Sequence, residues 1–494
     1  METKLQATTT DLRIRWLLLF ALLIQLLFCI TQIGFLHPDQ HFQLIEFSSW
    51  QLGKPSGATS VWELTSQIRP TFQVYLFSGF VELCTFLHID NAYTQLLILR
   101  IIFGLLGFAL FNRLAFHYFK NDRQLLFLVL LLLNFSWTMP YVCTLFSSEM
   151  ASSIVFFGAI LLYERKREET VYLILTGFLF CLAFYLRFQI AFGLVGFGLW
   201  MLLIEKKYTR LLPMILGFGI GLGLNMALDY YFYHQLVFTP YSYYRVNITE
   251  GKAAEFGTSS FLFYIVMLTL VIGTPPLSLF LFYYSLKAAL KQYRQPLVFA
   301  VVFFVVGHSF VGHKEERFLF PVLNVLPIIA GWGLMSFINY YRTHKKAQGF
   351  LKGILYTSVT LTAVTLGFFI INPYSQSIEF SRKLTNEFTQ STPLIYCLNR
   401  TPFETENHLP LTFYRRSAQN LKLIRISNAD SVRYIRNGWL ATTYNDAKER
   451  LPLIDSLGFK PQFYSSTAFW KINQFLQSKD INTINEIWVL YKKE

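Results

Sequence analysis

The sequence predicts an all-α polytopic membrane protein with about eleven to twelve transmembrane helices, followed by a small C-terminal α/β domain outside the membrane. Of its 494 residues, 53% are hydrophobic and only 15% are charged, whereas soluble globular proteins carry roughly 25% charged residues. Apolar runs of about 20 residues, the length that spans a bilayer, recur from Trp16 onward. After Pro373 the composition becomes polar and mixed in charge.

The apolar runs are predicted to be helices because lipid cannot satisfy the hydrogen bonds of an exposed backbone. The first run lacks a following small-residue cleavage site, so we expect it to remain as a membrane anchor. Pro70–Leu87 is a candidate twelfth span. The other eleven are Arg13–Phe35, Thr94–Phe111, Gln124–Pro140, Tyr141–Tyr163, Val171–Phe188, Gln189–Ile204, Leu211–Tyr233, Phe261–Leu286, Pro296–Gly312, Arg317–Tyr340 and Phe350–Ile371.

The formal net charge of +14 is interpreted as a sign of topology, because the basic residues form short clusters between apolar runs, as cytoplasmic loops do. No basic stripe with interleaved aromatic residues supports a nucleic-acid partner. The clusters are Arg13/Arg15, Lys120/Arg123, Arg165/Lys166/Arg167, Lys206/Lys207/Arg210, Lys287/Lys291/Arg294 and Arg342/Lys345/Lys346. Placing them in the cytoplasm puts loops 36–70, 234–260 and 313–316, and residues 373–494, on the opposite side.

This topology has one inconsistency. Pro70–Leu87 and Thr94–Phe111 cannot both cross the membrane if Asn112–Arg123 is cytoplasmic. Either one of the two apolar segments is re-entrant, or one basic cluster is assigned to the wrong side. The transmembrane domain is predicted to comprise residues 1–372 in either case.

The C-terminal segment, residues 373–494, has apolar residues at a period of two in four places, which predicts strands. These places are Leu394–Leu398, Leu421–Ile426, Leu440–Tyr444 and Ile487–Tyr491. A helix is predicted over Asn445–Leu457, ending at Gly458. The five cysteines include no CxxC spacing, so neither a disulfide framework nor a zinc site is predicted.

The first external loop places His37, Asp39 and His41 close to an apolar span, and ionisable groups at a membrane face are functional candidates. A partly desolvated carboxylate such as Asp39 can serve as a general base. The alternative is a solvated loop whose charges merely flank a helix. In an extended chain these three side chains would share one face, so a metal site is conceivable, although substrate contact or hydrogen bonding around Asp39 is favoured.

The second constellation is GHSFVGHKEERFLFPVLN, in which five consecutive ionisable residues, His313 to Arg317, stand between two apolar spans. Lys314 and Arg317 are candidate phosphate-binding cations. His313, Glu315 and Glu316 would orient them or bind sugar hydroxyls. The alternative is an ordinary polar loop with internal ion pairs.

Two further features are predicted on the same side of the membrane. The segment from Asp229 to Tyr244, DYYFYHQLVFTPYSYY, is rich in aromatic residues, which either stack on carbohydrate or form an interfacial belt. Arg187 stands alone between apolar stretches, where an arginine snorkels to the interface or pairs with an anion.

These residues resemble the sequence signatures of glycosyltransferase family 22, the GT-C fold α-mannosyltransferases of GPI-anchor and N-glycan assembly. HPDQ with the later WEL and IRP resembles the family's first loop, HKEERFLFPV its second signature, and DYYFYHQLVFTPYSYYRVN its D-x-x-FYG...TP...N segment. The sequence departs from the pattern at Gln40, where the family usually has Glu, and at Pro70 in place of Ser. The likeness covers roughly Leu36 to Pro327.

The resemblance implies inverting transfer of mannose from polyprenyl (dolichyl) phosphate mannose to a hydroxyl of a lipid-linked glycan or GPI-like glycolipid, without a cofactor or metal. Asp39 is the expected base, and Lys314, Arg317 and Arg187 are the expected donor-phosphate ligands. The expected substrate-binding residues are His37, Gln40, Trp62, Glu63, Arg69, Asp229, His313, Glu315 and Glu316.

Two alternatives remain at this point. One is a GT-C transferase that uses another lipid-phosphate-linked sugar or a protein acceptor. The other is a lipid-linked sugar transporter, which the lack of a visible repeat and the crowding of polar residues on one face disfavour. The expected location is a bacterial inner membrane or the endoplasmic reticulum membrane, with the active site on the non-cytoplasmic face. The expected partners of the protein then also include the membrane lipids around it.

Overall fold

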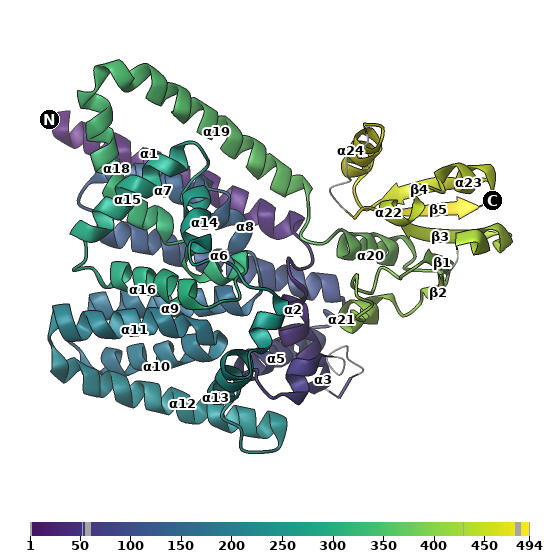
Figure 1. The fold of residues 1–494 in the computed structure, drawn as a ribbon, viewed down its shortest axis with the longest axis horizontal. Helices are drawn as coiled ribbons and strands as arrows, with labels where there is room; N and C mark the ends of the chain where they lie inside the picture. The colour runs from purple at the N-terminus through teal and green to yellow at the C-terminus, as the bar shows by residue number, and fades with distance from the viewer. Residues whose placement is uncertain (1, 52, 55–60, 428, 480–485, 494) are drawn as a thin grey trace. The chain divides into compact units, whose positions relative to one another are not determined.

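The computed structural model describes residues 2–51, 53–54, 61–427, 429–479 and 486–493, so residues 52 and 55–60 of the predicted first loop lie outside the described residues. It is mostly helical, with one sheet near the C-terminus (Figure 1). The chain forms two compact units. The first comprises Met1–Ile30, Thr65–Gln73 and Leu99–Ile370, and the second comprises Thr31–Leu64, Val74–Ile98 and Ile371–Glu494.

Among the described residues, five helical segments are long and apolar enough to cross a membrane, or up to seven if each of two bent helix pairs counts as one span. This supports an integral membrane protein, while the predicted number of eleven to twelve spans stays a prediction. The five are Thr10–Thr31, Ala92–Phe119, Phe188–Glu205, Tyr208–Tyr233 and Lys345–Ile371. The bent pairs are Leu277–Lys291 with Pro296–Phe310, at 120°, and Glu316–Leu323 with Leu326–Thr343, at 68°.

The helices that lie wholly or mainly in the first unit account for most of the apolar sequence. They are α1 (Glu2–Thr31), α6 (Ala92–Phe119), α7 (Arg123–Phe135), α8 (Thr138–Val142), α9 (Ser148–Lys166), α10 (Thr170–Leu186), α11 (Ala191–Trp200), α12 (Leu211–Tyr233), α13 (Thr239–Tyr244), α14 (Phe263–Val271), α15 (Leu277–Lys291), α16 (Pro296–Phe310), α17 (Phe320–Leu323), α18 (Leu326–Thr343) and α19 (Gln348–Ile371).

Several predicted boundaries in this unit are wrong, and three of them have a clear cause or consequence. The span predicted over Phe261–Leu286 is divided between α14 and α15, because two prolines and a glycine interrupt it after Ile272. Helix α9 begins at Ser148, seven residues later than predicted, and the side chain of Ser147 caps it by accepting a hydrogen bond from the Met150 amide. Helix α6 continues to Phe119, beyond the predicted end of this span at Phe111.

Helices α10 and α12 approach each other closely at two glycines. A Cβ atom built on Gly177 would lie 1.9 Å from the carbonyl oxygen of Met214, and one built on Gly217 would lie 1.8 Å from that of Ile174. Small residues at these two positions therefore let the backbones meet, which is the usual way that helices pack without a hydrophobic driving force in lipid.

The second unit combines the segments around the first loop with the C-terminal segment. Its helices are α2 (Pro38–His41), α3 (Phe47–Gln51), α4 (Trp62–Thr65), α5 (Phe72–Phe86), α20 (Gln376–Glu387), α21 (Thr412–Arg415), α22 (Tyr444–Ala447), α23 (Leu451–Ser456) and α24 (Thr467–Gln477). A π-helical turn at Phe42–Glu46 joins α2 to α3. The strands are β1 (Leu394–Leu398), β2 (Lys422–Ile426), β3 (Gly438–Thr443), β4 (Phe459–Tyr464) and β5 (Trp488–Lys493).

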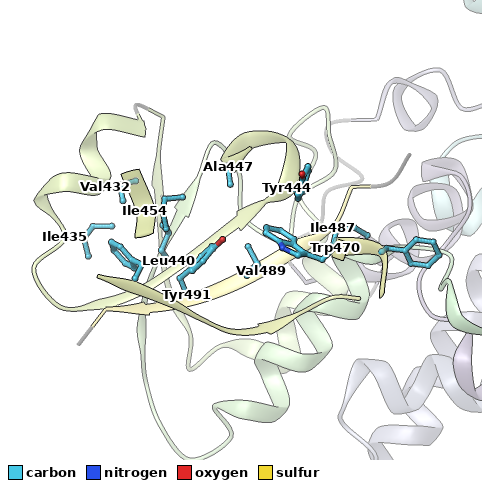
Figure 2. Close-up of a cluster of buried hydrophobic side chains, with 12 residues drawn as sticks. Val432, Ile435, Leu440, Tyr444, Ala447, Ile454, Trp470, Ile487, Val489 and Tyr491 are labelled. Carbon is cyan, nitrogen blue, oxygen red and sulfur yellow. The ribbon is translucent and has the colours of Figure 1, made fainter. Parts of the chain in front are cut away.

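The five strands form one sheet in the order β2-β1-β3-β5-β4 (Figure 1). Strand β1 runs parallel to β2 and β3, whereas β5 runs antiparallel to β3 and β4. Buried side chains from β3, β5 and the C-terminal helices form the core of this α/β domain, with Leu440, Tyr444, Trp470 and Val489 among them (Figure 2). The prediction of a small C-terminal α/β domain is confirmed.

The four predicted strands are present, and β4 is an additional one. The helix predicted over Asn445–Leu457 is instead two short helices, α22 and α23. Pro452 lies in the first turn of α23, where its missing amide is tolerated, so a second helix starts there. Gly458 ends the segment as predicted, with a φ of 81° that favours glycine.

Candidate functional site

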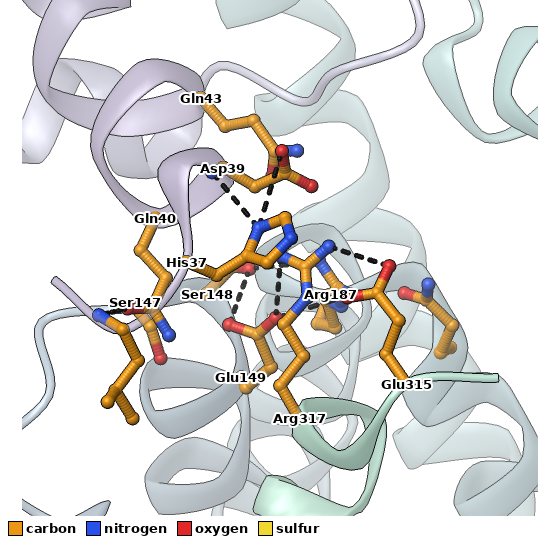
Figure 3. A network of polar contacts seen from close by, with 12 residues as sticks. His37, Asp39, Gln40, Gln43, Ser147, Ser148, Glu149, Arg187, Glu315 and Arg317 are labelled. Carbon is orange, nitrogen blue, oxygen red and sulfur yellow. Dashed lines mark hydrogen bonds and ion pairs between the residues drawn. The ribbon is translucent and has the colours of Figure 1, made fainter. Parts of the chain in front are cut away.

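The first unit contains a buried ion cluster centred on Glu149. Its Oε1 atom lies 3.3 Å from Nη2 of Arg187 and 3.8 Å from Nη1 of Arg317, as Figure 3 shows. The Glu149 side chain is 1% exposed, and those of Arg187 and Arg317 are 5% and 9% exposed. The structure therefore brings two predicted phosphate ligands together on one carboxylate.

Each member of this cluster stands where a helix begins or ends. Glu149 is in the first turn of α9, where the helix dipole favours a negative charge. Arg187 is the residue at which α10 ends, with an extended backbone, and its Nη1 atom also donates to the Ser148 hydroxyl at 3.3 Å. Arg317 lies in a short 3-10 turn, Glu316–Leu319, after the HKEE loop.

Glu315 adds a second carboxylate to the cluster. It pairs with Nε of Arg317 and accepts a hydrogen bond from its Nη2 atom at 3.1 Å. The two arginines and the two glutamates cancel in formal charge. The phenyl ring of Phe318 lies 5.4 Å from the guanidinium of Arg187 and 5.5 Å from that of Arg317, so cation–π contact further fixes both groups.

The other ionisable residues of the HKEER segment take different positions. The ammonium group of Lys314 is tied to the backbone carbonyl oxygens of Val311 and Ser259, at 3.0 Å from the latter. The ring of His313 lies 2.9 Å from Oε1 of Glu315. Glu316 is exposed. Lys314, predicted to bind phosphate beside Arg317, is thus placed to hold the loop, because its charge is solvated by carbonyl dipoles.

Asp229 is fully buried in α12 and accepts three hydrogen bonds. Its Oδ1 atom accepts from the Thr71 amide at 2.9 Å and hydroxyl at 2.7 Å, and its Oδ2 atom accepts from the Thr239 hydroxyl at 2.6 Å. A carboxylate with no exposed surface and three donors is suited to fixing this turn. The prediction that it binds substrate gains no support from this environment.

Arg69, another predicted substrate ligand, lies near the same turn. Its guanidinium is 5.8 Å from the ring centroid of Tyr243, and its carbonyl oxygen accepts a hydrogen bond from the Tyr233 hydroxyl at 2.8 Å. The aromatic segment after Asp229 is thus tied to the end of the first loop. Among its side chains, Tyr231, Leu236 and Tyr241 are more than half exposed.

In the second unit, the HPDQ motif begins a short helix. Pro38 occupies the first turn of α2, and Nδ1 of His37 accepts a hydrogen bond from the Asp39 amide at 3.2 Å (Figure 3). The Asp39 carboxylate lies 3.5 Å from the same nitrogen and is one-third exposed. Gln40 is buried, and its Oε1 atom accepts from the Leu36 amide at 3.0 Å. Asp39 is therefore the accessible carboxylate of this motif.

The idea that His37, Asp39 and His41 share one face of an extended chain is wrong, because Pro38–His41 is helical and residues two apart on a helix point to different sides. The His41 ring is fully buried, with Nε2 2.8 Å from Oε1 of Glu46. Within the described ranges, no three His, Cys, Asp or Glu side chains are grouped as a metal site would need.

Glu46 is a buried carboxylate that sequence reasoning did not select as a site residue. Besides His41, it accepts hydrogen bonds from the Thr412 hydroxyl and, at 3.0 Å, from the Phe413 amide. Burial raises its pKa, but these hydrogen bonds and the charge of His41 outweigh that effect and lower the pKa to about 2. The first loop is thereby joined to helix α21 of the C-terminal segment.

The remaining predicted residues of this loop lie at its other end. Glu63, in α4, is 6% exposed and accepts a hydrogen bond from Nε2 of Gln43 at 3.3 Å. Trp62, which precedes it, is half-buried. Gln43 thus connects the HPDQ helix region to the WEL motif.

The sequence matches the model of the Alg9-like mannosyltransferase family over residues 16–398. The chain belongs to this family. GPI mannosyltransferase 3 of Candida albicans is 28% identical over 220 residues, which are 44% of this chain and 41% of that protein, so this alignment spans less than half of the relative. GPI alpha-1,2-mannosyltransferase 3 of Bos taurus is 23% identical over 412 residues, covering 80% of this chain and 72% of the relative.

Among solved structures, ArnT from Cupriavidus metallidurans bound to undecaprenyl phosphate has a TM-score of 0.50 at 13% identity and covers 97% of both chains. At this identity the likeness concerns the fold alone, which is the GT-C fold. The match to the family model over residues 16–398 confirms the resemblance to glycosyltransferase family 22.

Glu149 is the residue of this Alg9-like protein that sequence reasoning missed most clearly. The signal available was a single carboxylate within an apolar stretch, SSEMASSIVFF, which a buried segment tolerates only when the charge is paired. Its two partners come from distant segments of the chain, so the pairing could not be deduced from spacing.

Proposed function

We propose that this chain is an inverting α-mannosyltransferase that moves mannose from a polyprenyl phosphate carrier to a hydroxyl of a lipid-linked glycan. Membership of the Alg9-like mannosyltransferase family supports the sugar and the reaction class. The observation that carries the proposal is the pair of guanidinium groups, Arg187 and Arg317, oriented by the buried Glu149. Planar guanidinium groups match the oxygens of a phosphate.

In the proposed reaction the acceptor hydroxyl attacks C1 of mannose and inverts its configuration. The bond between C1 and the phosphate oxygen breaks as the new glycosidic bond forms. The hydroxyl proton passes to Asp39, the accessible carboxylate of HPDQ. Arg187 and Arg317 stabilise the charge that develops on the departing polyprenyl phosphate.

Asp39 and His37 form the proposed base unit. His37 accepts the Asp39 amide hydrogen and so fixes the start of α2, while its ring lies within 3.5 Å of the carboxylate. Gln40 occupies the position where the family usually has Glu, and its buried amide oxygen caps the backbone. Asp39 therefore acts without a neighbouring carboxylate at position 40. We place this chemistry on the non-cytoplasmic face of the membrane, where the basic clusters put the first loop.

The test is Asp39→Asn in the full-length protein, reconstituted with polyprenyl phosphate mannose and a lipid-linked glycan acceptor. We expect transfer to be abolished, while expression and the apparent melting temperature stay at wild-type values. Asp90→Asn, an exposed aspartate in the same unit, is the matched control. Full activity of the Asp39 variant would refute the base assignment, and transfer only from a carrier of another sugar would refute the donor assignment.

A further inference from the structure

The C-terminal α/β domain contains a polar cavity of about 620 Å³ that the proposed transfer reaction does not use. This volume falls within the usual range of roughly 300 to 1,000 Å³ for sites that bind small ligands. The cavity is lined by residues that follow β1, β2 and β3, including Asn399, Ser427 and Asp446. It therefore lies at the carboxyl ends of the parallel strands.

The order of the strands places this cavity where open α/β sheets usually bind ligands. In the order β2-β1-β3, the chain leaves β1 toward one neighbour and later returns to the other side of it, so the strand order reverses between β1 and β3 (Figure 1). Open α/β sheets bind ligands at the carboxyl ends of strands beside such a reversal, because the connecting loops diverge there. Asn399 and Arg400 follow β1, and Asp446 follows β3.

Polar contacts join several of the groups that line the cavity. Asn399, with a left-handed φ of 64°, donates through its side-chain amide to Oδ1 of Asp446. The Oδ2 atom of Asp446 accepts from the Thr443 hydroxyl at 2.6 Å. Arg400 is buried, pairs with Glu486, and lies 5.5 Å from the ring centroid of Trp488. These hydrogen bonds hold the side chains of Asn399, Thr443 and Asp446 together at the carboxyl ends of β1 and β3.

The lining mixes positive and negative groups in nearly equal number. Arg400 and Arg425 oppose Glu406, Asp446 and Glu486, so the carboxylates outnumber the guanidinium groups and disfavour a phosphate or another strong anion. The described carboxylates and histidines form no group of three that would hold a metal ion. A lining that offers both donors and acceptors suits hydroxyl groups, which donate and accept at once.

We infer that this cavity is a carbohydrate-binding site and that it takes the glycan part of the acceptor. The identification of the glycan rests on the proposed function, whereas the existence of a sugar site rests on the cavity itself. Arg425 and Glu406, both exposed at its rim, contact the sugar hydroxyls. Asp446 and Asn399 line the cavity beside them. The C-terminal domain thereby recognises the glycan in the acceptor, which gives this domain a role in substrate selection.

The test uses the full-length protein purified in detergent and a soluble α-linked mannotriose, with binding measured by saturation-transfer NMR and titration. No donor is present. Arg425→Ala and Glu406→Gln remove exposed groups and so leave the fold intact. We expect each to weaken mannotriose binding at least five-fold. Lys422→Ala, at the opposite end of the same strand β2 and exposed, is the matched control and should bind as the wild type does.

Failure of this inference can be separated from failure of the proposed function. A wild-type protein that binds mannotriose but transfers no mannose would refute the proposed function alone. A protein that transfers mannose but binds no mannotriose, or binds it equally well in all variants, would refute the sugar site. Saturation of the cavity by inorganic phosphate, with loss in Arg425→Ala and no sugar binding, would also overturn it. In transfer assays the two rim variants should raise the KM for the acceptor and leave the KM for the donor unchanged.

Discussion

Oε1 of Glu149 lies 3.3 Å from Nη2 of Arg187, and both side chains are at most 5% exposed. A buried carboxylate between two guanidinium groups has one physical role that follows directly from its position. It neutralises and orients two cations that would otherwise be costly to bury. The strength of donor binding should therefore depend on a residue that itself repels phosphate.

Glu149→Gln removes this charge and leaves a side chain of similar shape. Breaking a buried ion pair by removing one partner costs about 3 to 5 kcal/mol, because the remaining charge is left uncompensated. We expect a lower apparent melting temperature in detergent and a loss of transfer of at least ten-fold. Glu255→Gln, which removes an exposed carboxylate paired with Lys252, should change neither. Wild-type stability and activity in the Glu149 variant would contradict the cluster's role.

Arg317→Ala and Lys314→Ala test which of two cations binds the donor phosphate, because the sequence alone does not distinguish them. Loss of a charge-assisted hydrogen bond costs about 1.5 to 3 kcal/mol, so Arg317→Ala should raise the KM for the donor roughly ten-fold or more. Lys314→Ala should have a smaller effect on that KM, because its ammonium group binds backbone carbonyls. Steady-state kinetics at varied donor concentration decide between them, and the reverse order would reject Arg317 as the phosphate ligand.

The membrane helices could be predicted because their signal is local. An apolar run of bilayer length must satisfy its own backbone hydrogen bonds in lipid, so it forms a helix. Helices α12 and α19 therefore follow directly from the sequence. Strand β1 also has the predicted bounds, Leu394–Leu398. Strand β4 was missed because Pro461 and Gln462 interrupt the apolar alternation in FKPQFY. Its pairing with β5 stabilises it as a strand although its own sequence does not indicate one.

The candidate site was only partly predictable, for a different reason. Residue types predicted that Arg187 and Arg317 are cations near an external face, but nothing local showed that they meet at Glu149. In the same way, Lys314 and Arg317 stand three residues apart and have similar chemistry, although their side chains bind different groups. Pairing between distant segments is set by the packing of several helices, which spacing along one chain does not encode.

Glu46 gives a prediction with a defined dependence on pH. Its pKa is lowered from 4.5 to about 2 in the folded protein, so its carboxylate stabilises the fold above pH 4.5, by about 3 kcal/mol at 1.36 kcal/mol per pKa unit. That contribution is lost as the pH falls from 4.5 to 2, because the unfolded chain takes up the proton first.

Glu46→Gln should therefore lower the apparent melting temperature at pH 7, and the difference from wild type should shrink as the pH falls below 4.5. Thermal unfolding of both proteins, measured in detergent at a series of pH values, checks this. Glu449→Gln, an exposed glutamate of the C-terminal segment, controls for the loss of one charge. A difference that grows on acidification would show that the folded-state pKa of Glu46 is raised instead.

The close approach of α10 and α12 gives the last prediction. Gly217→Ala places a methyl group 1.8 Å from the carbonyl oxygen of Ile174, so the two backbones must separate. Gly219→Ala changes the same helix at a position with nothing within 4 Å of the new Cβ atom, and alanine is favoured over glycine in a helix by about 1 kcal/mol. We expect Gly217→Ala to lower the apparent melting temperature and Gly219→Ala to leave it unchanged or raise it slightly. Equal stability of the two variants would mean that α10 and α12 do not depend on this contact, because the substitutions differ only in what the added methyl group meets.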